Sequence, residues 1–547
     1  MNALVPLPVL LPLLAAGSEL VLGTRYPRAQ RFVGVVVLTA VLGLSLTLLV
    51  AADTRGPIVM HLGDFAPPLG ITLVADRLSA LMLTVSAAVT LCVLVYSIGQ
   101  GMADREEQSP LAVFHPAYMV LVAGVSCTFL AGDLVNLYVG FEIMLVASFV
   151  LLTLGGTAAR LRAGATYVLV SLVSSMVFFT AVALTYAAAG TVNLAQLAVR
   201  LAELPIGVRT LLEATLLTVF AVKAAVFPLA AWLPDSYPTT PAPVTAVFAG
   251  LLTKVGVYCV LRTETLLFPG NRLGDLLLVA ALASLVVGVL GAVAQTDLKR
   301  VLSFVLISHI GYMIFGIGIG TRAGLGGAIV YVVHHITVQT ALFLVAGLIE
   351  RRTGTTELTR VGGLAAAVPA LGALFLLPAL NLAGIPPMSG FIGKLELLRA
   401  GVADAGVLAY VLVGAASLTS LLTLYVMAKV WNLAFWRAAP AGAAERGTVL
   451  EEPDTDDSGP DGDGDGDGVV RRPSPAGQAV TATLSGRAIT VTTTTDRLPR
   501  TMTWATAALV LLSLAYTVLG DPFTAVTGRA ADELLERSPY IEAVLGR

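Results

Sequence analysis

The chain has 547 residues, of which 56% are hydrophobic and only 12% are charged. A soluble globular domain carries about 25% charged residues, so this composition excludes a protein that faces water over most of its surface. The net charge is −2 and no basic patch stands out, which argues against a nucleic-acid partner. The composition therefore indicates that the lipid bilayer is the main solvent of the chain.

Continuous apolar runs divide the chain into segments long enough to cross a membrane. A bilayer core of about 30 Å requires roughly 20 apolar residues per helix. Because the runs are continuous rather than alternating, we expect helices and not a β-barrel. The sequence predicts an all-α polytopic membrane protein with about fourteen transmembrane helices. The predicted spans lie near residues 3–22, 32–52, 72–98, 111–131, 134–154, 163–188, 209–232, 241–262, 274–294, 301–320, 324–349, 368–398, 405–434 and 502–520.

Basic residues follow the first, fifth, ninth and eleventh predicted spans, so that every second loop is the basic one. These residues are Arg25, Arg28, Arg31, Arg160, Arg162, Lys299, Arg300, Arg351, Arg352 and Arg360. The positive-inside rule places such loops in the cytoplasm and therefore both termini outside. The opening segment 1–22 lacks a basic start and is interpreted as a first span, not a cleaved signal.

Residues 436–500 lose hydrophobicity and gain Asp, Gly, Thr and Pro, including an alternating Asp/Gly run from Asp461 to Asp467. A calcium-binding loop of the EF-hand type would need a bidentate glutamate at its twelfth position, where this chain has Arg472. The segment is therefore predicted to be a disordered acidic cytoplasmic insert.

Two predicted spans contain proline where a helix should be continuous. The first carries Pro228 and Pro234, and the second carries Pro386 and Pro387. Proline inside a helix removes a backbone donor and costs about 3 kcal/mol, so each position is either a simple kink or a break facing an ion path. Two breaks near buried lysines favour two five-helix repeats of inverted topology. The expected organisation is a three-helix segment at 1–110, repeats at 111–265 and 266–435, the insert at 436–500, and a last helix with tail at 501–547.

Four charged residues lie inside predicted spans. They are Glu142, Lys223, Lys254 and Lys394. Placing a charged side chain at the bilayer centre costs at least about 2.5–3.5 kcal/mol of insertion free energy. Four such residues therefore indicate that the charges have a function. Desolvation disfavours the charged form of both residue types, which suits groups that exchange protons. The structural alternative is an ion pair that fixes helix packing, which accounts for Glu142 and one lysine only.

Three of the five histidines are also intramembrane: His309, His334 and His335. Histidine can relay a proton through either ring nitrogen, although a buried histidine is also a common packing group. No His/Cys/carboxylate spacing indicates a metal site, and neither a Walker A sequence nor a haem or iron–sulfur motif occurs. The sequence therefore predicts no cofactor, and the driving energy must come from an ion gradient or a partner.

Six motifs resemble a known superfamily. They are Gly132–Glu142 (GDLVNLYVGFE), Trp232–Pro238 (WLPDSYP), Leu251–Tyr258 (LLTKVGVY), Asp297–Phe304 (DLKRVLSF), Ile307–Tyr312 (ISHIGY) and Gly384–Lys394 (GIPPMSGFIGK). They resemble the antiporter-like membrane subunits that include proton-pumping subunits of respiratory complex I, and within these the D-subunit family of Mrp-type multisubunit Na⁺/H⁺ antiporters. The resemblance covers roughly residues 70–435.

The resemblance implies a role for each buried polar residue. Glu142 and Lys223 match the coupling pair of the family, Lys254 the central relay and Lys394 the exit-side residue. Four residues after His335 the family usually has a lysine, and this chain has Gln339. A glutamine side chain can hydrogen-bond a water molecule, but it cannot take up a proton and become charged. With His309, these residues form the expected proton-translocation set.

The implied function is a proton-translocating subunit of a multisubunit Na⁺/H⁺ antiporter, a secondary transporter and not an enzyme. Its expected partners are other membrane subunits of the complex, Na⁺ and H⁺, within a bacterial inner (plasma) membrane. The main alternative is a proton-pumping subunit of a complex I-type NADH–quinone oxidoreductase. A second alternative is a structural subunit whose buried charges only fix assembly.

Overall fold

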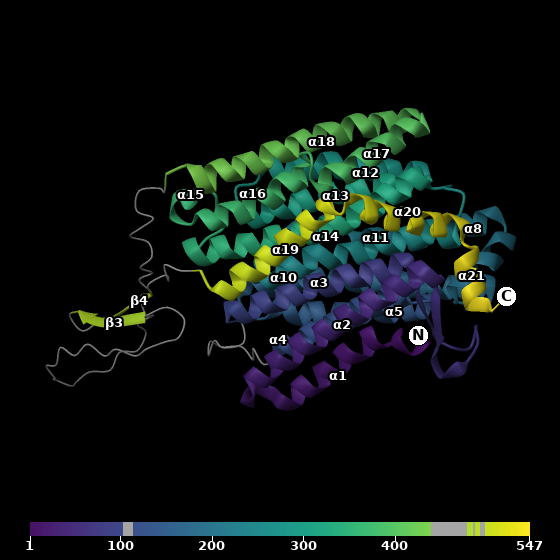
Figure 1. Cartoon of the computed structure of the whole chain (residues 1–547), viewed down its shortest axis with the longest axis horizontal. Coiled ribbons are helices and arrows are strands. Elements are labelled where there is room, and N and C mark those ends of the chain that lie inside the picture. The colour runs from purple at the N-terminus through teal and green to yellow at the C-terminus, as the bar shows by residue number, and fades with distance from the viewer. Residues whose placement is uncertain (102–112, 439–478, 485–486, 493–497, 547) are drawn as a thin grey trace.

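Long helices lying side by side make up the computed structural model, which describes residues 1–101, 113–438, 479–484, 487–492 and 498–546. Both chain ends lie at the same end of this bundle (Figure 1). The helices are α1 Leu7–Leu22, α2 Pro27–Arg55, α3 Arg77–Gln100, α4 Phe114–Leu130, α5 Leu134–Thr153, α6 Ala158–Ala189, α7 Leu194–Arg200, α8 Ile206–Ala224, α9 Leu233–Ser236, α10 Ala242–Val247, α11 Thr253–Arg262, α12 Gly274–Ala294, α13 Leu298–Ile319, α14 Arg322–Thr353, α15 Leu364–Ala367, α16 Pro369–Ala383, α17 Ser389–Asp404, α18 Val407–Trp431, α19 Arg500–Val518, α20 Gly520–Glu536 and α21 Ser538–Leu545.

The predicted all-α membrane fold is confirmed, and every predicted span contains at least part of a helix. Span 72–98 begins in strand β2, and span 209–232 runs past the end of α8 at Ala224. Within the described residues, eleven helices are long and apolar enough to cross a membrane, while α4 and α16 are apolar but shorter. The number of fourteen crossings therefore stays a prediction. Helix α14 lies at the centre of the bundle, since its apolar window is fully buried, whereas most of α2 faces outward.

Two short hairpins accompany the helices. Strands β1 Ile58–His61 and β2 Thr72–Ala75 pair antiparallel at the end of the bundle that carries both termini. Strands β3 Ala479–Leu484 and β4 Arg487–Thr492 pair antiparallel within the insert. The prediction of disorder was therefore wrong for these two segments, because their Val, Ile and Thr residues favour strands. The Asp461–Asp467 run and the predicted boundary at residue 110 lie outside the described residues.

Two isolated backbone bridges show how the halves of the chain are related. Asp133 pairs with Asn193, and Asp297 pairs with Glu357, so that both members are displaced by the same 164 residues. The side chains of Asp133 and Asp297 cap α5 and α13, each accepting the backbone N–H three residues on. The helices that follow, α6 and α14, both have 32 residues, begin after a threonine cap and end at a left-handed glycine.

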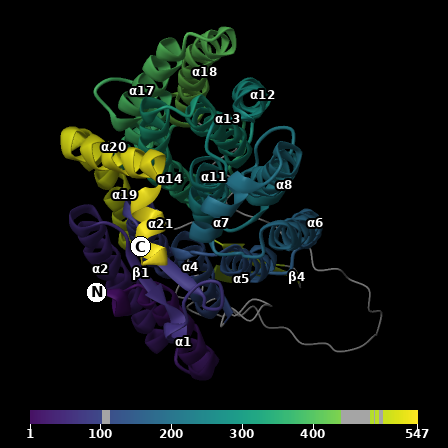
Figure 2. The ribbon, with the colours of Figure 1, turned by 90° about the vertical axis from the view of Figure 1, so that its right-hand side faces the viewer.

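These matching bridges lie at opposite ends of the bundle. The first adjoins β2 and α7, which lie at the end with the termini, and the second immediately precedes α15 at the other end (Figures 1 and 2). Equivalent helices thus run in opposite directions, as expected of two five-helix units with inverted topology. The boundaries 111–265 and 266–435 stay predictions.

Both proline-containing spans are interrupted. Helix α8 ends at Ala224, and Pro228 lies in the turns that separate it from α9. Pro234 was predicted to break a helix, but it lies in the first turn of α9 and therefore opens one. Pro386 and Pro387 lie between the end of α16 and the start of α17. The residue that ends α16, Gly384, has a φ of 86°, a conformation that favours glycine.

A glycine allows the first interruption to lie directly against α11. A Cβ atom on Gly256 would be 2.5 Å from the backbone nitrogen of Ala224 and 2.9 Å from the carbonyl carbon of Lys223. Such distances leave no room for a side chain. Gly256 therefore brings the end of α8 into backbone contact with α11.

We predict that Gly256→Ala lowers the free energy of unfolding by about 1–3 kcal/mol, because the added methyl group must push α8 and α11 apart. The measurement is the thermal unfolding midpoint of the purified protein in detergent. Gly414→Ala on α18 is the matched control, since a Cβ there meets nothing within 4 Å. Equal midpoints for the two variants would contradict the prediction.

Candidate proton pathway

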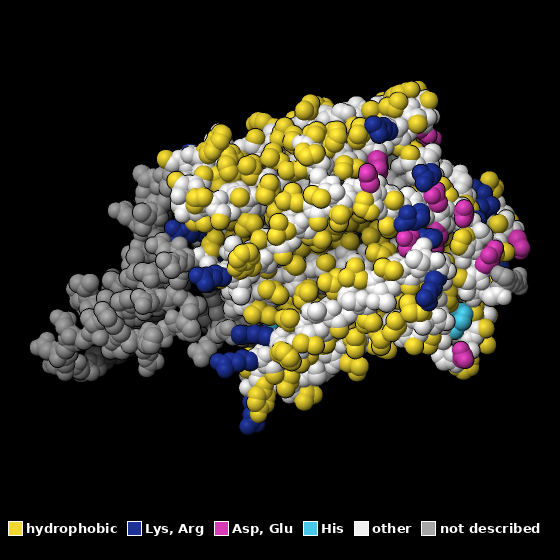
Figure 3. Space-filling view, viewed as in Figure 1, with side chains coloured by type: hydrophobic (Ala, Val, Ile, Leu, Met, Phe, Trp, Pro, Cys, Tyr) yellow, Lys and Arg dark blue, Asp and Glu magenta, His cyan; other side chains and the backbone are white. Residues whose placement is uncertain are grey.

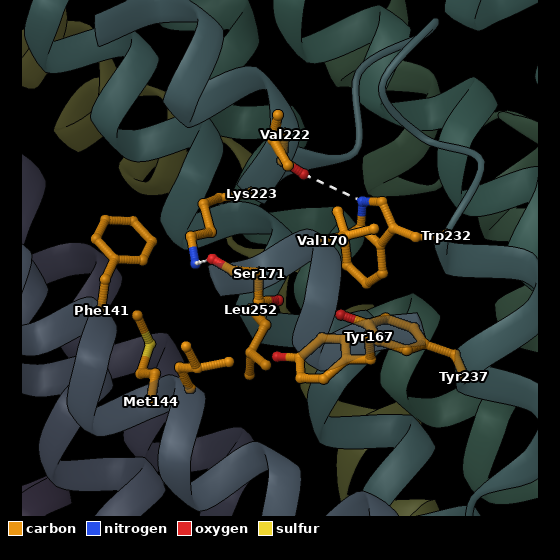
Figure 4. A pocket seen from close by; sticks show the side chains of 11 residues that line it. Phe141, Met144, Tyr167, Val170, Ser171, Val222, Lys223, Trp232, Tyr237 and Leu252 are labelled. Carbon is orange, nitrogen blue, oxygen red and sulfur yellow. Dashed lines mark hydrogen bonds between the residues drawn. The ribbon is translucent and has the colours of Figure 1, made fainter. Parts of the chain in front are cut away.

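Lys223 occupies the last turn of α8, just before the first interruption. Its Nζ lies 3.5 Å from the backbone oxygen of Ser171 and 3.5 Å from Ser175 Oγ, both on α6. The nitrogen also lies 5.7 Å from the ring centre of Phe141. Figure 4 shows the Lys223 nitrogen pointing to Ser171 beside Phe141 and Met144, in a cavity of about 30 Å³. That volume is enough for one or two water molecules.

Glu142 lies on α5, next to Phe141, and interacts electrostatically with Lys223. No ion pair within 4 Å joins the two side chains among the described residues, and Glu142 Oε1 is buried without a hydrogen-bond partner. The structure therefore brings the predicted coupling pair into one region of α5, α6 and α8, but not into direct contact. A gap of this kind leaves each group able to change its charge without breaking a hydrogen bond to the other.

Lys254 is completely buried at the start of α11. The preceding residues, Phe248–Leu252, form a π-helical turn, in which the backbone bonding pattern shifts by one residue. The Nζ of Lys254 donates a 2.6 Å hydrogen bond to the carbonyl oxygen of Ala249 in that turn. Lys254 is therefore held by a backbone carbonyl of its own irregular helix and not by a carboxylate.

A cluster of rings continues from Lys254 into the second half of the molecule. His335 on α14 interacts electrostatically with Lys254, and its ring centre lies 5.2 Å from that of His309 on α13. His309 Nδ1 lies 2.7 Å from the hydroxyl of Tyr331. All three side chains are completely buried. The predicted residues His309 and His335 are thus neighbours, and both ring nitrogens of His335 have no partner among the described residues.

His334 faces a different group from its neighbour His335. Its Nδ1 lies 3.0 Å from Ser389 Oγ, at the first position of α17. Ser389 Oγ in turn lies 3.3 Å from the side-chain oxygen of Asn381 on α16. His334 therefore links α14 to the second interruption, whereas His335 belongs to the ring cluster, as their separation of about 100° on a helix requires.

Lys394 is buried on α17, beside the second interruption. Its Nζ donates to the carbonyl oxygens of Leu382 and Ala383 and to Ser420 Oγ, each at 3.0 Å. These carbonyls belong to the last turn of α16, where the break removes their usual helical partners. The nitrogen also lies 5.0 Å from the ring centre of Tyr312. A cation suits this position, since a helix C-terminus carries partial negative charge.

Gln339 is completely buried on α14, one turn beyond His335. Its Nε2 donates a 2.8 Å hydrogen bond to the carbonyl oxygen of Leu302 on α13. Its Oε1 has no partner among the described residues. Gln339 therefore presents one free acceptor in the interior, where the sequence resemblance leads us to expect a titratable lysine.

Sequence reasoning missed two tyrosines that connect the predicted residues. Tyr331 hydrogen-bonds His309, and Tyr312 packs 5.6 Å from the His309 ring and beneath Lys394. The spacing of these tyrosines from the histidines could have identified them in the sequence. Tyr312 follows His309 by three residues, and Tyr331 precedes His334 by three, so each pair shares a helix face.

The residues form a series through the bundle. It runs from Glu142 and Lys223, through Lys254, to the His335–His309–Tyr331 cluster and on to Lys394. Within the described part of the chain no group of three or more His, Cys, Asp or Glu side chains could hold a metal ion. The fold and this series define a polytopic membrane protein that carries titratable side chains through its interior, with interrupted helices beside its lysines.

Comparison with known proteins identifies the family. The family model described as NADH:quinone oxidoreductase/Mrp antiporter, TM, matches residues 131–423, and the chain belongs to this family. The D subunit of the Na⁺/H⁺ antiporter of Alkalihalophilus pseudofirmus is 42% identical over 440 residues, covering 80% of this chain and 87% of the relative. The corresponding D subunit of Bacillus subtilis is 37% identical over 445 residues, covering 80% and 87%. The predicted resemblance to antiporter D subunits is confirmed.

Solved structures agree with this assignment. A chain in the structure of the Mrp complex from Dietzia sp. DQ12-45-1b superposes with a TM-score of 0.84 and 29% identity, covering 100% of this chain and 99% of that one. A chain of respiratory complex I from Thermus thermophilus with bound NADH gives a TM-score of 0.74 at 24% identity, covering 99% and 100%. The second match shows a shared fold.

We predict that Tyr331→Phe slows proton movement roughly tenfold, because it removes one hydrogen bond to His309 while keeping the ring packing. The measurement is proton flux in vesicles containing the assembled complex. Tyr425→Phe on the exposed face of α18 is the control. If the Tyr331→Phe variant keeps the wild-type flux, the Tyr331 hydroxyl is not part of the pathway.

A second prediction concerns Gln339. Gln339→Leu should slow proton flux, because leucine removes the amide that donates to the Leu302 carbonyl and an apolar gap does not retain water. Gln339→Lys should be tolerated, since an amine can donate to the same carbonyl. Flux measured against pH in both variants tests this. Full activity of Gln339→Leu would mean that protons bypass this position.

Proposed function

We propose that this chain is the proton-translocating membrane subunit of a multisubunit monovalent cation/proton antiporter, with Na⁺ as the cation. The observation that carries the proposal is a series of three lysines inside the bundle, each bound to backbone oxygens beside a helix irregularity. Lys254 and Lys394 are buried and Lys223 is half-buried. That this series occurs in a chain 42% identical to an antiporter D subunit supports the choice of transport process.

A proton-pumping subunit of a complex I-type oxidoreductase is the second candidate. It is supported by the shared fold with the Thermus thermophilus complex, at 24% identity. The sequence relatives favour the antiporter, since two proteins named as D subunits of Na⁺/H⁺ antiporters match at 37% or more over most of the chain. A role in cation/proton exchange therefore has more support than a role in quinone reduction.

The hydrogen bonds of the lysines suit proton transfer. An ammonium group has three donors, and a neutral amine keeps two N–H groups. Lys394 and Lys254 can therefore release a proton and still donate to the carbonyls that hold them. Their burial disfavours the charged form, while the carbonyl oxygens favour it. This balance makes both protonation states accessible, as a relay requires.

Each predicted residue then takes one part of the process. Glu142 and Lys223 form the coupling pair, in which the charge of one sets the proton affinity of the other. Lys254 passes the proton to the His335–His309–Tyr331 cluster, and Lys394 releases it on the far side. Where neighbouring groups do not hydrogen-bond directly, a water molecule must bridge them.

The orientation and partners follow from charge and family. On the face drawn in Figure 3, the end opposite the termini shows Lys and Arg without acidic side chains, whereas the terminal end shows both kinds. By the positive-inside rule, this distribution of charge supports an orientation with both termini outside a bacterial plasma membrane. The chain would act as a secondary transporter, without enzymatic chemistry, and together with other membrane subunits of the complex.

Glu142→Ala and Lys223→Ala should each abolish Na⁺-dependent proton exchange while the complex still assembles. The reason is that each change removes one charge of a pair that makes no direct ion pair, so packing survives. The measurement is Na⁺-dependent dissipation of a pH gradient in vesicles carrying the whole gene set. Arg162→Ala, at an exposed position, is the control for loss of a charge. Normal exchange by an assembled Glu142→Ala complex would rule out the coupling role.

The same vesicles separate the two candidate functions. The antiporter predicts that adding Na⁺ dissipates a pH gradient without any electron donor. The oxidoreductase subunit predicts proton movement only when a reduced donor and quinone are supplied. Vesicles that contain this chain alone should show neither response, because transport is expected only of the assembled complex.

A further inference from the structure

Two carboxyl groups outside the described pathway contact each other in the first half of the molecule. Glu213 lies in the second turn of α8, and Glu264 lies in a π-helical turn, Thr263–Leu267, that continues α11. These two segments pack together, and the two side chains lie within hydrogen-bonding distance. Neither residue belongs to any of the motifs that indicated the pathway.

Both side chains are withdrawn from solvent. Glu213 has no exposed surface and Glu264 is 6% exposed. All four carboxyl oxygens are buried, and no side chain among the described residues donates a hydrogen bond to them, while the backbone N–H of Leu273 interacts with Glu213. Two ionised carboxylates cannot hydrogen-bond each other, since both only accept. A contact of this kind is satisfied when one proton lies between the two groups, as like charges in contact do not both ionise.

The surrounding cations do not neutralise the pair by direct contact. Arg209 and Arg272 interact with Glu213 through space, and Arg209 Nε is itself buried without a partner. Arg262, two residues before Glu264, pairs with Asp76 instead. Arg537 of the last helices donates to the carbonyl oxygens of Leu266 and Ala198. Removal of the proton would therefore leave a buried negative charge whose compensation comes from the backbone N–H of Leu273 and from arginines that make no ion pair with it.

The position of the pair relates it to the lysines. Glu213 precedes Lys223 by ten residues on α8, and Glu264 follows Lys254 by ten residues on the helix that runs the other way. Ten helical residues span about 15 Å. The pair therefore lies about 15 Å from both lysines along two contacting helices. It lies toward the bundle end where α8 begins, which is the end that carries both termini (Figure 1).

We infer that Glu213 and Glu264 form a second proton-binding site, a carboxyl pair that shares one proton between the terminal side of the membrane and Lys223 and Lys254. This inference rests on the proposed function, since it adds a proton-binding site to the same pathway. The ligand is a proton, bound between two carboxyl oxygens. A structural hydrogen bond and a Na⁺ site are the alternatives that the experiment must separate.

Glutamine variants test the inference while preserving the contact. In Glu213→Gln or Glu264→Gln the amide N–H can donate to the remaining carboxylate, so assembly should be normal. Proton exchange should fall roughly tenfold, and its dependence on pH on the terminal side should weaken, while its dependence on the opposite side is unchanged. Because the pair acts as a unit, the double variant should be no worse than the slower single variant.

A spectroscopic measurement on the purified complex tests the proton directly. Infrared difference spectra taken across pH should contain the C=O stretch of a protonated carboxylic acid in the wild type. That band should be lost in each single variant and in the double variant. Glu203→Gln, an exposed acid at the same end of the molecule, is the matched control and should retain it.

Three results would overturn the inference. In the first, both single variants keep the wild-type rate and pH dependence and the infrared band persists, which leaves only a structural hydrogen bond. In the second, the variants change the apparent affinity for Na⁺ but not the response to pH, which indicates a cation site. In the third, the wild type lacks the band. Failure of the proposed function is distinguishable, because a wild type without Na⁺-dependent exchange can still show the band.

Discussion

Backbone carbonyl groups inside hydrocarbon must be hydrogen-bonded by the protein itself, and the lysines of this chain meet that requirement. The break between α16 and α17 frees the carbonyls of Leu382 and Ala383, and Lys394 donates to both. The π-helical turn before α11 exposes the carbonyl of Ala249, to which Lys254 donates. The irregular backbone and the buried cation therefore stabilise each other, and neither is expected at this depth without its partner.

This mutual dependence explains why, among the described residues, no carboxylate interacts with Lys254 or Lys394. A carboxylate would fix the ammonium form through a strong ion pair, whose rupture is costly at low dielectric. Carbonyl dipoles favour the cation less strongly and accept equally well from a neutral amine. Glu142 and Lys223 follow the same rule at longer range, since the two interact electrostatically without an ion pair. Lysines that exchange protons are thus served by partners that form no direct ion pair with them.

The sequence predicted the fold class, and it named most residues of the proposed pathway, because both depend on local composition. Apolar runs located the helices, and isolated charges within them located Glu142, Lys223, Lys254 and Lys394. Hydrogen-bond partners were not predictable in this way. The contact of Tyr331 with His309 depends on the packing of α13 against α14. Pro234 was assigned to a break because its place at a helix start depends on where α9 begins. Strands β3 and β4 were missed because the acidic composition of the whole insert concealed two short β-branched segments.

The 164-residue displacement between the two bridged aspartates has a consequence for how the chain tolerates change. Asp133 and Asp297 cap equivalent helices at opposite ends of the bundle. A substitution of Asp133 therefore affects the end that carries the termini, and a substitution of Asp297 affects the other end. Because the same contact occurs once at each end, each end can vary in sequence without a change to the buried residues between them.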